Sequence, residues 1–510
     1  MTASVLPLLV AVALLAAGFL VACGDRPRLH ATVLLTVLTA VTATGVGLVV
    51  TLADGGVLAH GVGRWPFGVA IPFAADMFTA LMLTVTGLLS LTVAAFALAQ
   101  GRVGTRYFAP LVLVLTAGVN GALSTADLFN LFVFVEVMLL PSYGLFVLAA
   151  PRKAPLRQIA GARLYVTVNL LTSTVFLAGV GFVYGTAGTV NLAELAGAAR
   201  RDETVALATA VCLFALGIKA AVVPVHGWLA RAYPATSPVV TALFSGLHTK
   251  VAIYAIYRIY AVVFDGDTRY LWVGVVVFSL TMVVGVLGAV GEDTTRSILA
   301  FHMVSQIGYI LLGVALFTEA GLTAGIFYLL HHMIVKASLF LSTGAVEVRH
   351  GTGALGAVSG LARREPVIAA AFLVAALSLA GLPPFSGFVA KLSLVTAALD
   401  TGRSTAAVVM ILVSLVTLLS MLKIWSGVFW GPVGKGPVGK GSGGEGPVGQ
   451  GPGGEPAGPR IGVALAAPAV VLATLTLGLG LGAELLLTLA RIAAAGLHDP
   501  SGYVEAVIGS

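Results

Sequence analysis

The chain has 510 residues, of which 28 are Lys or Arg and 21 are Asp or Glu, so charged side chains make up only 10%. Ordinary soluble domains carry about 25% charged residues, and 58% of this chain is hydrophobic. This composition excludes a soluble globular protein, a disordered chain and a nucleic-acid binder. It predicts an all-α polytopic membrane protein.

Apolar segments of the length needed to cross a bilayer, about 20 residues, recur along the whole chain. The first 22 residues resemble a signal peptide, and Leu20–Cys23 resembles a lipoprotein cleavage site. Residues 1–22 contain no Lys or Arg, however, so the segment is predicted to be a membrane span. The fourteen predicted spans are 4–22, 30–52, 76–99, 107–124, 127–149, 163–185, 203–231, 237–263, 270–291, 296–317, 322–346, 366–399, 404–430 and 461–494.

Two of the predicted spans are longer than a bilayer requires and contain proline. Segment 203–231 contains Pro224, and segment 366–399 contains Pro383 and Pro384. Because proline lacks a backbone donor and clashes with the preceding turn, both spans are predicted to be broken helices. In transporters, a pair of interrupted helices marks the ion pathway.

The positive charges between the spans predict the orientation of the chain. Seventeen cations lie in the odd-numbered connections and seven in the even-numbered ones, at helix ends or in the tail. The odd connections are therefore predicted to be cytoplasmic, with both termini on the outer face of the cell membrane. The odd set is Arg26, Arg28, Arg102, Arg106, Arg152, Lys153, Arg157, Arg163, Arg231, Arg296, Arg349, Arg363, Arg364, Lys423, Lys435, Lys440 and Arg460, and the even set is Arg64, Arg200, Arg201, Arg258, Arg269, Arg403 and Arg491.

The segment 431–459 is rich in Gly and Pro and repeats a six-residue unit, which is typical of a flexible linker. We place this linker, bounded at 431–460, on the cytoplasmic side, before a C-terminal helix and tail at 461–510. The two cysteines, Cys23 and Cys212, do not form a metal or redox motif. No nucleotide-binding motif is present either, so the sequence predicts no cofactor.

Five charged residues fall inside the predicted spans, where a charge costs at least about 2.5–3.5 kcal/mol and indicates a functional site. They comprise one acid and four bases. Low dielectric disfavours the ammonium form of lysine unless an opposite charge is near. We therefore expect the glutamate to pair with one lysine, preferably Lys219, while the others exchange protons. The five residues are Glu136, Lys219, Lys250, Lys336 and Lys391.

Histidines are interleaved with these lysines. His248 lies two residues before Lys250, and His332 lies four residues before Lys336, so that the latter pair shares one helix face. His331 points about 100° away from His332, and His302 lies in the neighbouring span. Because histidine exchanges protons near neutral pH, the sequence predicts a proton relay that contains these four histidines.

Several motifs resemble those of one membrane-protein superfamily. The chain is similar to the proton-pumping membrane subunits of respiratory complex I and of the Mrp-type multisubunit Na+/H+ antiporters, most of all to the D-type subunit of the antiporters. The resemblance covers nearly the whole chain outside 431–459. The motifs are Asp127–Glu136 followed by Pro141 and Tyr143, Gly217–Pro224 with Trp228, Ser237–Val251, and Ala380–Lys391.

This resemblance implies two inverted five-helix repeats, at 107–263 and 264–430, behind N-terminal helices at 1–106. It also implies a polar axis through Glu136, Lys219, Lys250, His332, Lys336 and Lys391, and a place in a hetero-oligomeric complex that exchanges Na+ for H+. In one departure, Ala230 and Arg231 follow the Trp–Leu pair where family members often carry Pro–Asp, which puts an ion-entry role there in doubt.

Two other functions stay open on the sequence. The same residues suit a proton-pumping subunit of an NADH:quinone oxidoreductase or a membrane-bound hydrogenase, driven by a distant redox reaction. More remotely, His248, His302, His331 or His332 suit the axial ligands of a haem in a redox protein, although that function leaves four intramembrane lysines unexplained. The preferred prediction is a secondary transporter subunit and not an enzyme.

Overall fold

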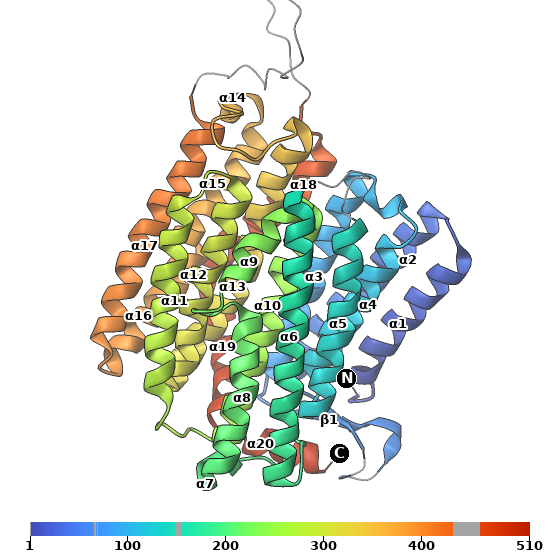
Figure 1. Cartoon of the computed structure of the whole chain (residues 1–510), viewed down its shortest axis with the longest axis vertical. Helices are drawn as coiled ribbons and strands as arrows, with labels where there is room; N and C mark the ends of the chain where they lie inside the picture. Colours follow the sequence, from blue (N-terminus) through green and yellow to red (C-terminus); the bar gives the residue numbers. More distant parts are fainter. Residues whose placement is uncertain (1, 66–67, 69, 149–155, 432–459, 510) are drawn as a thin grey trace, which may run out of the picture.

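The computed structural model describes residues 2–509 apart from 66–67, 69, 149–155 and 432–459. Figure 1 shows a bundle of long helices aligned with the long axis of the molecule. Within the described residues, twelve helices are long and apolar enough to cross a membrane. They are α1 (Val5–Cys23), α2 (Pro27–Thr51), α3 (Met77–Ala99), α5 (Leu128–Leu148), α6 (Leu156–Ala187), α8 (Glu203–Ala220), α10 (Pro238–Ile259), α11 (Leu271–Gly291), α12 (Thr295–Leu316), α13 (Glu319–His350), α17 (Ser404–Ile424) and α18 (Val463–Leu481).

This count does not confirm the predicted number of fourteen spans. Segment 107–124 forms α4 (Phe108–Ser124), and the first half of segment 366–399 forms α15 (Pro366–Ala380); both are apolar but shorter. The remaining helices are α7 (Ala198–Arg201), α9 (Gly227–Ala232), α14 (Leu361–Arg364), α16 (Ser386–Asp400), α19 (Ala483–His498) and α20 (Ser501–Ile508). Short 3-10 turns cover Val62–Arg64, Arg102–Gly104 and Tyr233–Ala235, and π-helical turns extend α10 and α17 over Tyr260–Phe264 and Trp425–Phe429.

Both predicted helix breaks are confirmed. The first span stops at Ala220, where Ala221 adopts a left-handed conformation with φ of 64°, and resumes as α9 beyond Pro224. The second stops at Ala380, with Gly381 left-handed at φ 89°, and resumes as α16 beyond Pro383 and Pro384. Breaks of this kind leave carbonyl groups without intrahelical partners, which other side chains must satisfy.

The helices fall into two runs with the same order of elements. In the run α4, α5, α6, α8–α9, α10 and in the run α11, α12, α13, α15–α16, α17, the broken helix takes the fourth place. This order agrees with the pair of five-helix repeats that the resemblance implies. The division of the chain at 107–263 and 264–430, with its N-terminal and C-terminal segments, stays a prediction.

The nearly all-helical class is confirmed, with a small sheet that the sequence did not predict. Strand β1 (Leu58–Gly61) pairs antiparallel with β2 (Pro72–Ala75), in a register that aligns Leu58 with Ala75. This hairpin joins α2 to α3 at the end of the bundle where Figure 1 shows the C-terminus. Directly after β2, Asp76 accepts a hydrogen bond from the backbone of Thr79 and begins α3.

The last predicted span, 461–494, is wrong in its boundaries. Gly482 interrupts it, so that α18 ends at Leu481 and a second helix, α19, follows. A final helix, α20, ends the described chain near the hairpin. Continuous hydropathy hid this interruption, because glycine breaks the helix without adding polarity. The predicted linker at 431–459 lies outside the described residues except for Gly431.

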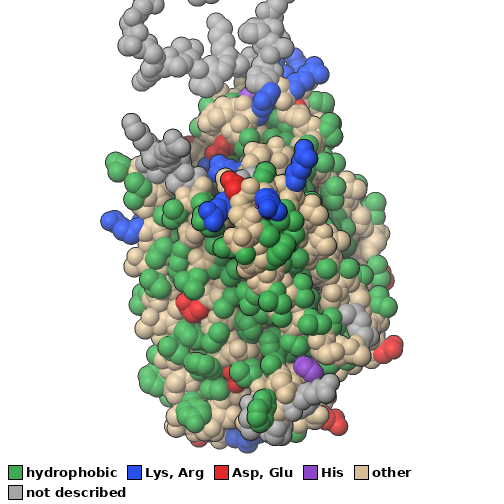
Figure 2. All heavy atoms as spheres, turned by 90° about the vertical axis from the view of Figure 1, so that its right-hand side faces the viewer, with side chains coloured by type: hydrophobic (Ala, Val, Ile, Leu, Met, Phe, Trp, Pro, Cys, Tyr) green, Lys and Arg blue, Asp and Glu red, His purple; other side chains and the backbone are tan. Residues whose placement is uncertain are grey.

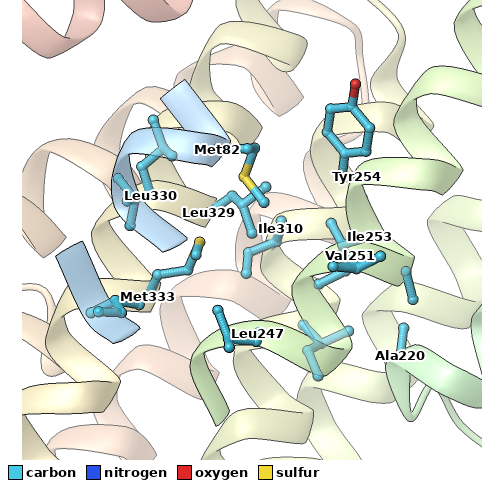
Figure 3. Packing of buried hydrophobic residues seen from close by; sticks show 14 of the residues in the cluster. Met82, Ala220, Leu247, Val251, Ile253, Tyr254, Ile310, Leu329, Leu330 and Met333 are labelled. Carbon is cyan, nitrogen blue, oxygen red and sulfur yellow. The ribbon is translucent and has the colours of Figure 1, made fainter. Parts of the chain in front are cut away.

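Three helices form the centre of the bundle. In the most apolar 18-residue windows of α10 and α13 every residue is buried, and in that of α12 94% are, against 28% in α11 and 33% in α1. Figure 3 shows how Met82 of α3, Leu247 and Ile253 of α10, and Leu329 of α13 pack in this centre. Figure 2 shows apolar side chains over most of one outer face, with many of the Lys and Arg side chains toward one end. The buried polar residues of α10, α12 and α13 therefore lie far from lipid.

Candidate functional site

All nine residues predicted to form the relay lie on helices of the two runs. Eight of them are buried, with side chains such as Lys219 only 3% exposed and Lys391 7% exposed. The exception is Glu136 on α5, which is half-buried. The buried residues are Lys219 on α8, His248 and Lys250 on α10, His302 on α12, His331, His332 and Lys336 on α13, and Lys391 on α16.

In the first run, one face of α6 contacts three of these residues. The Ser173 hydroxyl donates to a carboxylate oxygen of Glu136, and the Lys219 ammonium donates to Oδ1 of Asn169 at 3.3 Å. The Tyr165 hydroxyl lies 2.7 Å from Nδ1 of His248. Among the described residues, the expected direct ion pair between Glu136 and Lys219 is not formed. Each instead bonds to α6, although the Glu136 charge still acts on Lys219.

His248 is held at both of its ring nitrogens. Its Nδ1 faces Tyr165, and its Nε2 lies 2.9 Å from the hydroxyl of Ser142 on α5. The ring also stacks on Phe244 with centroids 4.5 Å apart. The charge of Lys219 acts on the ring across the interface between α8 and α10. His248 is therefore fixed in orientation, and it belongs with the group formed by Glu136 and Lys219.

His332 occupies the middle of the second run. It is completely buried, and neither ring nitrogen has a hydrogen-bond partner within the described protein. The charges of Lys250 on α10 and Lys336 on α13 both act on it. Because an unpaired buried polar atom costs about 1–3 kcal/mol, His332 is suited to hydrogen bonds with internal water. In the predicted relay, His332 stands between these two lysines.

The two central lysines make few other contacts. Lys250 donates to the hydroxyl of Thr249 at 3.0 Å, and Lys336 donates to the carbonyl oxygen of Leu299 at 2.9 Å. Among the described residues, neither forms an ion pair with an acid. A pair of lysines without counterions in low dielectric is costly when both are charged. An arrangement of this kind suits the predicted relay, in which these lysines gain and lose protons.

At the second helix break, Lys391 replaces the missing backbone donor. Its ammonium donates to the carbonyl oxygen of Ala380, the last residue of α15, at 2.9 Å, and to the Ser414 hydroxyl at 2.8 Å. The negative end of the helix dipole favours a cation at this position. His331 contacts the other side of the break, with Nδ1 2.8 Å from the hydroxyl of Ser386.

His302 links the central lysines to this break. Its Nε2 lies 2.9 Å from the hydroxyl of Ser420 on α17, and its Nδ1 has no hydrogen-bond partner in the described protein. The charges of Lys336 and Lys391 both act on the ring. The second run thus brings together His302, His331, His332, Lys336 and Lys391, the larger part of the predicted set.

Sequence reasoning missed three residues of this site. Tyr165, Asn169 and Ser173 are spaced four residues apart on α6 and bind Glu136, Lys219 and His248. The signal was present, since polar residues at this spacing within an apolar helix share one face. A second buried polar cluster, around the ion pair of Asp76 and Arg258, was also missed.

A helical membrane bundle with two broken helices and a buried line of lysine and histidine side chains defines an ion-translocating membrane subunit. A family described as NADH:quinone oxidoreductase/Mrp antiporter, transmembrane, matches residues 125–418. The chain belongs to this family.

The similar proteins include antiporter subunits and a subunit of a respiratory complex. The chain is 34% identical over 469 residues to the D subunit of the Na+/H+ antiporter of Alkalihalophilus pseudofirmus, covering 90% of each chain. It is 60% identical to a chain in the structure of the Mrp complex from Dietzia sp. DQ12-45-1b, with a TM-score of 0.94 and full coverage of both. A chain of the archaeal membrane-bound sulfane sulfur reductase is 25% identical, with a TM-score of 0.83 and 99% coverage of both.

Proposed function

We propose that this chain is the D-type membrane subunit of a multisubunit antiporter that exchanges a monovalent cation, Na+, for protons. The observation that carries the proposal is the line of buried titratable groups from Glu136 on α5 to Lys391 on α16. Protons move along this line through the lysines and histidines, and their movement is coupled to the cation. The chain is a transporter subunit and not an enzyme.

Coupling to sodium is favoured over coupling to a redox reaction. A proton-pumping subunit of a respiratory or hydrogenase complex would use the same line of residues. The relative in the archaeal sulfane sulfur reductase, a respiratory membrane complex, is 25% identical, whereas the one in the Mrp complex is 60% identical. The antiporter protein of Alkalihalophilus pseudofirmus also matches over 90% of its length.

Partner subunits complete the bundle at α5. Val133 and Leu140 expose 36% and 65% of their surface there, and the half-buried Glu136 lies between them along the helix. A carboxylate near lipid is costly. A neighbouring membrane subunit that covers this part of α5 removes that cost, in agreement with a hetero-oligomeric complex.

We further propose that both termini lie on the outer face of the cell membrane. The excess of Lys and Arg in the odd-numbered connections supports this orientation. Figure 1 shows the C-terminus at the end of the bundle opposite α14, with the N-terminus in the same half. The basic pair Arg363 and Arg364 in α14 then faces the cytoplasm.

The decisive experiment measures sodium-dependent proton flux in membrane vesicles that contain the complete complex. We expect Glu136→Gln to abolish the flux while the subunits still copurify. Glu505→Gln, at an exposed carboxylate on α20, serves as the matched control and keeps normal flux. Normal flux with Glu136→Gln would overturn the relay. Proton movement that needs an electron donor and ignores sodium would establish the redox-driven alternative.

A further inference from the structure

Helix α6 carries a line of three polar side chains, which we call the α6 stripe: Tyr165, Asn169 and Ser173. Their spacing of four residues places them on one face, over about 12 Å of helix. All three are buried, whereas Leu170 and Leu171 on the other side of α6 are 50% and 59% exposed. The stripe therefore faces the interior of the protein, and the apolar side of α6 faces outward.

Each member of the stripe contacts a titratable group from a different helix. Ser173 bonds to Glu136 of α5, Asn169 to Lys219 of α8, and Tyr165 to His248 of α10. A single straight helix thus sets the spacing of three groups that come from separate parts of the chain. Serine and tyrosine hydroxyls can each accept one proton while donating another, but an amide does neither near neutral pH.

The amide of Asn169 has a fixed orientation. Its Nδ2 donates to the carbonyl oxygen of Tyr165 at 2.8 Å, which turns Oδ1 toward the Lys219 ammonium at 3.3 Å. An acceptor oxygen bonds more strongly to a charged donor than to a neutral amine. Asn169 therefore favours the protonated form of Lys219 and contributes this preference at every pH, because the amide itself does not titrate.

The other groups that face Lys219 do titrate. The Glu136 carboxylate on α5 favours the ammonium when it is ionised, and His248 on α10 opposes it when it is protonated. Tyr165 on α6 bonds to His248 rather than to the lysine. The effect of Asn169 on Lys219 is therefore constant with pH, whereas the effects of Glu136 and His248 change with their own protonation.

We propose that Asn169 is a positioning residue that holds Lys219 beside Glu136 and sets the pH range over which the lysine releases its proton. This inference rests on the proposed function, since it concerns the proton relay of the exchange. It assigns Asn169 no proton of its own to transfer. Ser173 and Tyr165 hold Glu136 and His248 in fixed positions along the same face of α6.

The test compares two substitutions of about the size of Asn169, one that adds a negative charge next to Lys219 and one that removes the acceptor oxygen. Asn169→Asp places a second carboxylate against Lys219, so the lysine retains its proton to higher pH. Asn169→Leu removes the acceptor, so the proton is lost at lower pH. An opposite charge within a few ångströms changes the pH at which a group is half protonated by about 1 or more. We expect the pH of half-maximal exchange to move up in the first variant and down in the second.

The measurement is the pH profile of sodium-dependent proton flux in vesicles with the complete complex. Thr174→Val is the matched control on the exposed side of α6, where the hydroxyl bonds only within its own helix, and its profile stays unchanged. If Asn169→Asp fails to assemble, Asn169→Ser against Asn169→Leu gives the same test, because serine keeps an acceptor. We expect the serine profile to lie closer to the original than the leucine profile.

The outcomes separate this inference from the proposed function. Two profiles shifted in opposite directions, with Glu136→Gln inactive, support both. Unshifted profiles, or profiles shifted in the same direction, overturn the role of Asn169, while an inactive Glu136→Gln preserves the relay. Normal exchange with Glu136→Gln overturns the proposed function and this inference with it.

Discussion

His248 and Lys250 lie two residues apart on α10 and face opposite sides of the helix. The imidazole of His248 lies 2.7 Å from the Tyr165 hydroxyl on α6, in the first run of helices. Lys250 acts on His332 of α13, in the second run. Residues two apart on a helix point about 200° from each other. Helix α10 therefore contributes one side chain to the first-run part of the proposed relay and one to the second-run part.

Lys250 is therefore predicted to be needed for transfer between the two halves. Lys250→Met should abolish cation-dependent proton flux, and Lys250→Arg should do the same, because the guanidinium of arginine keeps its proton. The matched control is Lys423→Arg. Lys423 lies at the end of α17, where its ammonium bonds the carbonyl oxygens of Val290 and Glu292, and an arginine supplies the same cation. Flux through the Lys250→Arg variant near the original rate would show that Lys250 does not release a proton.

Lys391 is predicted to be needed for proton transfer and to contribute little to the stability of the complex. In Lys391→Met the carbonyl oxygen of Ala380 loses one donor but keeps the Ser414 hydroxyl, 2.7 Å away, so the complex should still assemble. Exchange should fall by about 100-fold or more, since a proton-transfer step by a positioned side chain is lost. Ser414→Ala removes the other donor and should cost only about 1 kcal/mol of stability, with exchange largely retained. The comparison uses flux and thermal unfolding of the purified complex; equal loss of exchange in both variants would contradict the distinction.

The second break is also predicted to depend on a close contact with α18. A Cβ at Gly480 would lie 2.6 Å from the backbone nitrogen of Ser386 and overlap the carbonyl oxygen of Pro384, whereas a Cβ at Gly478 would meet nothing within 4 Å. Gly480→Ala should therefore displace Ser386 from His331 and reduce exchange about tenfold or more. The unfolding temperature of the complex should fall as well, because the added methyl group overpacks this contact. Gly478→Ala tests the general effect of alanine in α18 and should behave like the original chain. Identical behaviour of the two variants would refute the importance of this contact.

A separate prediction concerns the buried ion pair outside the relay. The Arg258 guanidinium lies 2.7 Å from the Asp76 carboxylate, with side-chain exposures of 2% and 6%. Removal of one partner leaves an uncompensated buried charge, which costs about 3–5 kcal/mol. Arg258→Met should therefore lower the unfolding temperature of the complex markedly, and Asp76→Leu combined with Arg258→Met should restore much of it. A double variant no more stable than the single one would contradict this interpretation.

The amino-acid sequence was sufficient to predict much of the fold and of the site. Hydropathy located the helices, and Pro224, Pro383 and Pro384 located both breaks, because each is a local property of the chain. The intramembrane lysines were found in the same way, since a charge inside an apolar run is visible without neighbours. The roles of these residues in transport stay predictions.

The features that were missed depend on contacts between distant segments. In the sequence, Asn169 is one polar residue among others in a membrane helix, and its contact with Lys219 is visible only in the folded chain. Arg258 was counted as a helix-end charge, although its partner Asp76 lies 182 positions earlier in the chain. Periodicity and composition do not predict such pairings, because they arise from the packing of α6 against α8 and of α3 against α10.

The cluster around Arg258 connects the start of α3 to α20, the last helix of the described chain. The ring of Tyr503 on α20 stacks on the guanidinium, with its centroid 4.5 Å from the Arg258 Cζ, while Asp76 approaches from the start of α3. The closure of the bundle over this ion pair therefore depends on α20, and a chain without α20 lacks the aromatic ring that covers the Arg258 guanidinium.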